Sequence, residues 1–102
     1  MRLFVFFDLP VETSTDRRNY RHFRKFLIAN GYMMVQYSVY ARILLNYSSL
    51  KLQKEKIHQN LPPRGQVRTL LVTDKQFAKM DQFGKAKTES TNVSTTDRII
   101  EL

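Results

Sequence analysis

Short apolar runs, separated by polar turn residues, predict the strands of this chain. Leu3 to Phe7 is apolar at every position and is followed by the turn sequence Asp8-Leu9-Pro10, which predicts a strand with two apolar faces. Met33 to Val35 and Ser38 to Leu45 are rich in β-branched, aromatic and aliphatic residues. They predict two short strands, or one bent strand with a kink between the runs. Val67 to Thr73 predicts a further strand.

Between the first two runs the apolar spacing changes to that of an amphipathic helix. Thr13 with Asp16 three residues later forms a capping box, and Asn30-Gly31 supplies a stop, so a helix of about four turns is expected between them. At about 100° per residue, one arc of this helix is apolar and the opposite arc is cationic. The apolar arc holds Tyr20, Phe23, Phe26 and Leu27, and the cationic arc holds Arg17, Arg18, Arg21, Arg24 and Lys25.

The second half of the chain predicts less regular structure. Asn46 to Ser49 offers a cap for a second, more polar helix that closes at Pro62-Pro63, and Asp74 is expected to cap a short helical turn. Residues 85–96 are polar, rich in Ser and Thr and without period, so they predict a linker. Residues 97–102, which include Ile99-Ile100, predict a final strand.

The order strand, helix, strand, strand, helix, strand predicts an α+β fold of the ferredoxin-like (βαββαβ) type over residues 1–84, with helices on one face of an antiparallel sheet. Such a sheet has one bare face, and its apolar residues predict that a second copy covers it. We therefore expect a homodimer packed sheet to sheet. The strand at 97–102 is expected to pair across the dimer.

The charge of the chain is concentrated in one region. The formal net charge is +8, and no acidic residue occurs between Arg17 and Lys54. A field of this kind favours a polyanion, because neutralising phosphates releases condensed counterions. An anionic membrane surface is the alternative, but it requires an exposed apolar helix face, which this helix needs for the core. The cationic arc is therefore interpreted as the nucleic-acid-binding surface.

Composition excludes several other classes. The chain has no cysteine, so disulfides and thiolate zinc sites are excluded. No apolar stretch approaches the roughly 18 residues of a membrane span, and a cytoplasmic protein is expected. His22 and His58 lack an acid spaced to orient them, so they are expected at the surface.

Asp8 is the candidate for catalysis. It ends the first predicted strand on the same face as Phe4 and Phe6, so it is expected to point towards the dimer seam. Two facing carboxylates could hold Mg²⁺ or Mn²⁺ with waters and substrate phosphate, and so activate water for attack on a phosphodiester. Asp8 would then be both metal ligand and catalytic residue. The competing interpretation is turn chemistry, in which Asp bonds the backbone two residues on.

A single-strand RNA-binding module on the same fold is a further alternative. Phe4, Phe6, Tyr37 and Tyr40 could stack bases on an open sheet. The third strand lacks the Gly-aromatic-Gly signature of such modules, and a dimer would cover that face. This alternative ranks below the others.

Taken in order, several motifs together resemble the CRISPR-associated protein 2 family, and most closely its type II branch. They are Phe7-Asp8-Leu9-Pro10, Arg17-Arg18, Gly31-Tyr32, Gln36-Tyr37-Ser38-Val39-Tyr40, Thr69-Leu70-Leu71-Val72-Thr73, Asp74-Lys75-Gln76-Phe77-Ala78 and Asp97-Arg98-Ile99-Ile100.

The resemblance implies a ferredoxin-like homodimer that acts in spacer acquisition. The dimer would sit between two dimers of the integrase, CRISPR-associated protein 1, and hold duplex DNA by its phosphates while the integrase cuts and joins the ends. The resemblance also implies a metal-dependent endonuclease acting on RNA or DNA, with Asp8 as metal ligand. Many relatives carry an acidic residue after the aromatic that matches Tyr40, whereas this chain has Ala41. Loss of that carboxylate weighs against catalysis.

Overall fold

One antiparallel sheet organises the described part of the chain. A computed structural model describes residues 1–84, so the predicted linker at 85–96 and the predicted strand at 97–102 lie outside the described residues. The sheet order is β2-β3-β1-β4, the order of a ferredoxin-like fold. Along the chain the elements are β1 (Arg2–Asp8), α1 (Ser14–Ala29), β2 (Met33–Gln36), β3 (Val39–Ile43), α2 (Tyr47–Gln59), β4 (Gln66–Val72) and α3 (Asp74–Ala78).

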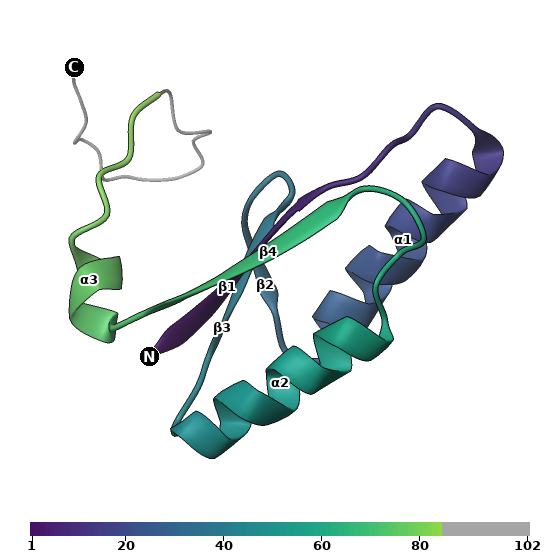
Figure 1. Cartoon of the computed structure of the whole chain (residues 1–102). Coiled ribbons are helices and arrows are strands. Elements are labelled where there is room, and N and C mark those ends of the chain that lie inside the picture. Colours follow the sequence, from purple (N-terminus) through teal and green to yellow (C-terminus); the bar gives the residue numbers. More distant parts are fainter. Residues whose placement is uncertain (85–102) are drawn as a thin grey trace.

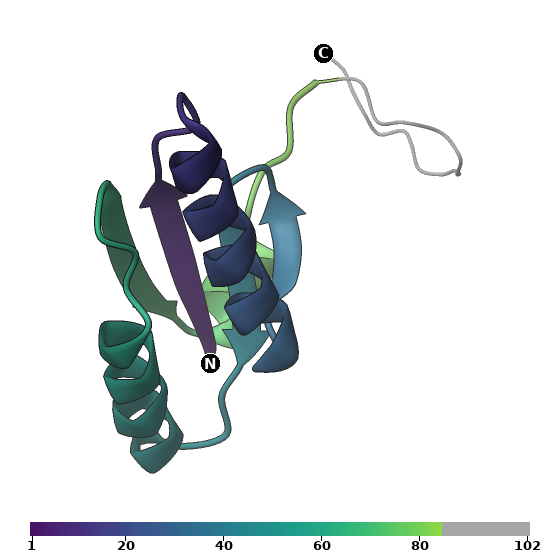
Figure 2. The same ribbon diagram turned by 90° about the vertical axis from the view of Figure 1, so that its right-hand side faces the viewer.

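The helices divide between the two sides of the sheet. In Figure 1, α1 and α2 lie on one side and α3 lies on the other. Turned by 90°, Figure 2 shows α1 crossing in front of the strands, with α2 beside it near the lower end of the sheet. The α+β, ferredoxin-like fold predicted from the sequence is therefore confirmed, with α3 as an addition on the second face. No helix within residues 1–84 is long and apolar enough to cross a membrane.

The core lies between the sheet and the two long helices. Leu3, Val5 and Phe7 alternate along β1 and are almost fully buried against the helices. Phe23 and Leu27 of α1, both at most 2% exposed, pack against them, as does Ile57 of α2. Burying each such side chain stabilises the fold by roughly 1.5–3 kcal/mol, so the amphipathic pattern of α1 fixes which of its sides meets the sheet.

The ends of α1 are set by local signals, as the sequence predicts. The hydroxyl of Thr13 accepts a hydrogen bond from the amide of Asp16 at 3.0 Å, and the Thr13 amide donates to the Asp16 carboxylate at 3.3 Å. This is the predicted capping box. At the other end, Asn30 is the C-cap and Gly31 follows with φ +87°, a conformation that favours glycine.

The two short strands form a tight hairpin, with a bulge between Met34 and Gln36. Its turn contains Ser38, which has φ +64°. The register pairs Tyr40 with Val5, so the Tyr40 side chain faces the helices and is 2% exposed. The hypothesis that Tyr40 stacks bases on the open face is therefore wrong. The sequence pattern alone did not set the register that decides this face.

The caps of the later helices are partly as predicted. Asn46 caps α2, its side chain accepting from the Ser49 amide at 2.8 Å. For α3 the cap is Thr73, which forms a capping box with Gln76, and not Asp74 as expected from the sequence. Asp74 instead lies 3.6 Å from the guanidinium of Arg2. Thr73 takes the cap position because its hydroxyl accepts from the Gln76 amide at 3.0 Å and its own amide donates to the Gln76 side chain at 2.9 Å.

The face of the sheet opposite α1 and α2, here called the open face, is apolar and only partly covered. Phe77 of α3 packs on Phe4 with 5.8 Å between ring centroids, and Phe4 is 5% exposed. Phe6 and Leu70 remain exposed, and with Met80 they line a groove of about 380 Å³. The sequence predicted a fully bare face, but α3 covers one end of it.

Candidate nucleic-acid interface and carboxylate site

The outer side of α1 carries exposed cations with no acidic neighbour. Arg18, Arg21 and Lys25 are all exposed. Within residues 1–84 none of the three takes part in a hydrogen bond or ion pair. These side chains are free to contact phosphates, and the guanidinium groups can each fork onto one phosphate. The structure thus places these three of the five predicted residues on one solvent-facing surface.

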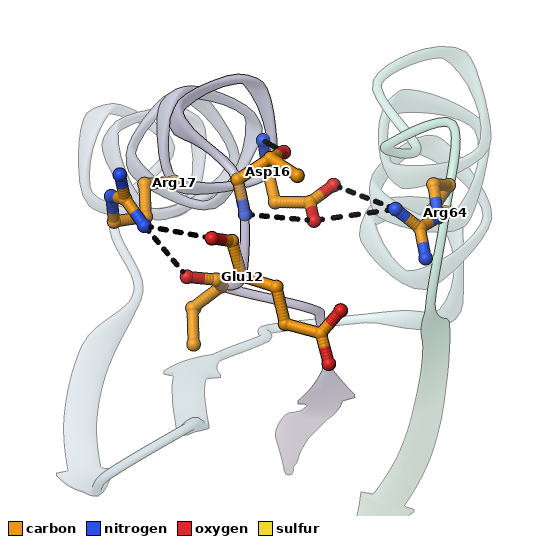
Figure 3. A network of polar contacts seen from close by, with 6 residues as sticks. Glu12, Asp16, Arg17 and Arg64 are labelled. Carbon is orange, nitrogen blue, oxygen red and sulfur yellow. Dashed lines mark hydrogen bonds and ion pairs between the residues drawn. The ribbon is translucent and has the colours of Figure 1, made fainter.

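The other two predicted cations make contacts within the chain. Arg17 Nη1 donates to the carbonyl oxygens of Val11 at 3.0 Å and Glu12 at 3.2 Å (Figure 3). Arg24 Nε donates to the hydroxyl of Tyr40 at 2.8 Å. Both side chains are therefore held against the body of the protein, although each guanidinium keeps further N–H donors. Within residues 1–84, the cationic arc thus consists of three side chains without hydrogen bonds and two that are hydrogen-bonded to other parts of the chain.

An ion pair that the sequence did not reveal supports the start of α1. Asp16 is 3% exposed, and Arg64 Nη1 lies 3.1 Å from its Oδ1 and 3.2 Å from its Oδ2 (Figure 3). Figure 3 shows Arg64 reaching across from the segment between α2 and β4. The capping box is enough to explain an acidic residue at position 16. For this reason no feature of the sequence indicated an ion-pair partner 48 residues away.

Several hydroxyl groups meet where the β2–β3 hairpin touches α1. The rings of Tyr20 and Tyr37 stack with 6.2 Å between centroids. Burial, followed by a side-chain hydrogen bond with Tyr37, raises the pKa of Tyr20, while hydrogen bonding to Ser38 works against this. Burial thus favours the neutral form of the Tyr20 phenol. These contacts fix the hairpin turn against the helix.

Asp8 ends β1 with an exposed carboxylate on the open face. In the sheet, Asp8 pairs with Gln66 of the neighbouring strand β4. It lines a pocket of about 310 Å³ together with Phe6 and Arg68. No hydrogen bond or ion pair within residues 1–84 involves its carboxylate. The turn hydrogen bond considered in the sequence analysis is thus not formed, and the carboxylate is available to a ligand.

The position of Asp8 depends on a close contact with Gly65. A Cβ atom placed on Gly65 would lie 2.6 Å from the carbonyl oxygen of Asp8 and 2.8 Å from Cδ2 of Leu9. Gly65 has φ +98°, which also favours glycine. The segment before β4 therefore packs directly on the end of β1, and only a residue without a side chain fits there.

Residues 1–84 contain no cluster of metal-ligating side chains around Asp8. Among the described residues no three His, Cys, Asp or Glu side chains cluster in a way that could hold a metal ion. Mg²⁺ is commonly held by one or two carboxylates with waters and substrate phosphates. Asp8 fits as one such ligand, because its carboxylate is exposed and lines a pocket.

The comparisons with known proteins agree with the fold. The model of the CRISPR associated protein Cas2 family matches residues 1–80. The "CRISPR-associated endoribonuclease Cas2" of Treponema denticola is 47% identical over 103 aligned positions and the match covers both chains completely. The protein of the same name from Ligilactobacillus salivarius is 49% identical over 80 residues, covering 78% of this chain and 79% of that one.

A solved structure shows the same arrangement of elements. The crystal structure of Streptococcus pyogenes Cas2 at pH 6.5 superposes with a TM-score of 0.63 at 22% identity, and covers 82% of this chain and 100% of that chain. A small α+β protein with a ferredoxin-like sheet and a cationic helix is the class that the fold defines. Within that class, the chain belongs to the Cas2 family of CRISPR-associated proteins.

Proposed function

We propose that this protein acts in CRISPR adaptation as a scaffold that holds duplex DNA during spacer acquisition. A homodimer would bridge two dimers of the integrase, CRISPR-associated protein 1, and support the middle of the captured fragment. The integrase would cut and join the DNA ends. Family membership supports the CRISPR-associated role, and the scaffold role rests on the surface of α1.

The observation that carries the proposal is the unpaired cationic side of α1. Arg18, Arg21 and Lys25 project to solvent, with no acidic side chain bonded to any of them within residues 1–84. Contacts of this kind bind phosphates without reading base sequence, as the capture of DNA fragments of any sequence requires. Arg17 and Arg24 border the same surface and would add to its field.

Duplex binding by charge-reversed variants tests the scaffold proposal. Arg18→Glu combined with Arg21→Glu should weaken duplex binding at least tenfold and lower the slope of log affinity against log salt by about 2. Lys75→Glu combined with Lys79→Glu, on or beside α3 on the other side of the sheet, is the matched control. If both double variants lose affinity equally, the effect is one of net charge and α1 is only a solvated face.

The integrase partnership calls for a separate measurement. Copurification of the tagged chain with the products of its genomic neighbours should recover the integrase, and a spacer-acquisition assay should require both proteins. If the chain copurifies with no integrase and acquisition proceeds without it, the adaptation proposal is wrong.

A metal-dependent endonuclease that uses Asp8 is the second candidate. The observation in its favour is the exposed Asp8 carboxylate, which has no hydrogen-bond partner in the described chain. The endoribonuclease name of the relatives supports it too. Asp8 from each subunit would hold Mg²⁺ or Mn²⁺, which would supply an activated water. The chain itself contributes the carboxylates and their placement against the substrate.

Replacement of Asp8 separates the two candidates. Asp8→Ala should abolish any metal-dependent cleavage and leave spacer acquisition largely intact, because bridging depends on cations and not on this anion. Thermal melts and a duplex-binding assay must first show that the variant folds and binds DNA. A variant that passes both checks yet acquires no spacers would make hydrolysis at Asp8 the function and the scaffold proposal wrong.

A further inference from the structure

The hairpin between β2 and β3 places an exposed aromatic side chain beside the cationic helix. Tyr37 is 74% exposed, and its ring stacks on Tyr20 with 6.2 Å between centroids and 23° between the ring planes. Because Tyr20 belongs to α1, this contact puts the Tyr37 side chain on the helix side of the sheet, away from the open face and the expected dimer seam. Tyr37 therefore stays accessible when a second copy covers the open face.

The turn that carries Tyr37 is tied to the end of β1. Ser38 has φ +64°, an unusual value for a residue other than glycine, and its carbonyl oxygen accepts from the amide of Phe7 at 3.1 Å. The ring of Tyr20 packs edge-on against Phe7, with 5.8 Å between centroids. Strained backbone positions of this kind cluster at ligand clamps. A side chain that the fold already holds in place loses little conformational entropy when it binds a ligand.

Two guanidinium groups flank the aromatic pair along α1. Arg17, Tyr20 and Arg24 follow one another at i, i+3 and i+7, so they form one stripe roughly 10 Å long with Tyr20 in its middle. Arg17 is held by two carbonyl oxygens and Arg24 by the hydroxyl of Tyr40, and both keep further N–H donors. The sequence from Arg17 to Lys54 contains no acidic residue. The stripe is therefore a set of pre-positioned hydrogen-bond donors for an anion.

The hydroxyl of Tyr37 adds a neutral donor to this stripe. Burial raises the pKa of Tyr20, a hydrogen bond with Tyr37 raises it further, and a hydrogen bond with Ser38 lowers it. These directions correspond to a Tyr20 phenol that donates to Tyr37 and accepts from Ser38. The Tyr37 oxygen then accepts from within the chain, and its own hydrogen is left for an acceptor outside it.

We propose that the Tyr37 hydroxyl donates a hydrogen bond to a backbone phosphate of bound duplex DNA, between Arg17 and Arg24, and thereby fixes the position of the duplex on α1. The inference rests on the proposed scaffold function and adds a neutral residue to its cationic surface. Tyrosine is among the side chains that bond phosphate oxygens, and such contacts set register without reading sequence. The competing explanation is that Tyr37 only braces the hairpin against α1.

Duplex binding by Tyr37→Phe tests the proposal, because this variant keeps the stacked ring and removes only the hydroxyl. It should bind about tenfold more weakly, the size of one hydrogen bond to a charged group. The slope of log affinity against log salt should stay as in the wild type, because a neutral contact releases no counterions. Two duplexes of unrelated sequence should lose affinity equally. Tyr47→Phe, on α2 and 71% exposed, is the matched control and should bind like the wild type.

Thermal melts establish that each variant is folded at the temperature of the binding assay. The proposal is overturned if Tyr37→Phe binds as the wild type does, which is the result that a simple brace predicts. It is also overturned if the salt slope of Tyr37→Phe falls, if its loss differs between the two sequences, or if Tyr47→Phe loses as much affinity.

The scaffold proposal fails on different evidence. If Arg18→Glu combined with Arg21→Glu binds duplex like the wild type while Tyr37→Phe does not, the free cations of α1 are not the binding surface and the Tyr37 contact stands. If the double variant loses affinity and Tyr37→Phe does not, only the Tyr37 contact is wrong. A wild-type chain that binds no duplex would overturn both.

Discussion

At Gly65 the packing of the chain leaves no room for a side chain. Gly65→Ala should lower the free energy of unfolding by about 2–4 kcal/mol for two reasons. The new Cβ would clash with the Asp8 carbonyl, and alanine would have to adopt the left-handed backbone conformation of this position. Gly31→Ala is the matched control, since Gly31 also has positive φ but an added Cβ would lie 3.7 Å from its nearest atoms, in the Arg42 side chain. It should cost only about 1–2 kcal/mol. Equal losses in urea melts would show that the backbone conformation, and not the contact with β1, decides the cost.

Tyr32 gives the stability of the fold a dependence on alkaline pH. Burial raises the pKa of Tyr32 to about 12, while the nearby Arg42 acts in the opposite direction. The unfolded chain loses this proton near pH 10, so stability is fully present below pH 10 and is lost as pH rises from about 10 to 12.

Urea melts between pH 9 and 12 check this dependence. Tyr32→Phe should be less stable at pH 9, because the Tyr32 hydroxyl donates to the buried Gln53 at 3.1 Å. Its stability should nevertheless fall less steeply with pH than that of the wild type. Parallel losses in the two proteins would contradict the assignment to Tyr32.

At the scale of single elements, the N-terminal turn of α1 depends on a long-range ion pair. Asp16→Ala should destabilise the protein by about 2 kcal/mol, because it removes both half of the capping box and the partner of Arg64. Arg64→Ala should cost about 1 kcal/mol, since its side chain is 62% exposed and the Thr13 amide still bonds the carboxylate.

A double-mutant cycle over Asp16 and Arg64, measured by chemical denaturation, should give a coupling free energy of roughly 0.5–1 kcal/mol. Thr13→Ala, which weakens the cap alone, separates the two contributions. A coupling indistinguishable from zero would mean that the cap alone holds this turn.

The elements that the sequence predicted well are those with local signals. The limits of α1 followed from its capping box and its Asn-Gly stop, and the strands β1 and β4 followed from apolar runs. The face presented by β3 did not follow, because the register between strands depends on partners distant in sequence. Tyr40 was therefore assigned to the wrong side. The partial covering of the open face by α3 escaped prediction for the same reason.

The candidate site was predicted in outline but not in its contacts. The charge pattern identified the cationic side of α1, and the end of the first apolar run identified Asp8. The contacts that hold Arg17 and Arg24 depend on carbonyl and hydroxyl groups that only the folded chain brings near.

At the scale of the whole molecule, the exposed apolar residues of the open face predict self-association. The protein should be a dimer at micromolar concentration by light scattering, because Phe6 and Leu70 stay exposed in the single described chain. Phe6→Glu should shift the equilibrium to monomer. Leu52→Glu, on α2 and 49% exposed, is the control and should remain dimeric. A wild-type monomer at every concentration would contradict this prediction.

The ion pair between Asp16 and Arg64 also has a consequence for local unfolding. Arg64 and Gly65 are adjacent, so the segment that pairs with the start of α1 is the segment that packs on the carbonyl of Asp8. Transient opening of either region breaks contacts of the other, and cooperative units of this kind exchange their amide hydrogens together. The first turn of the cationic helix and the carboxylate end of β1 should therefore unfold locally as one cooperative unit. A ligand that occupies either site would slow hydrogen exchange at both.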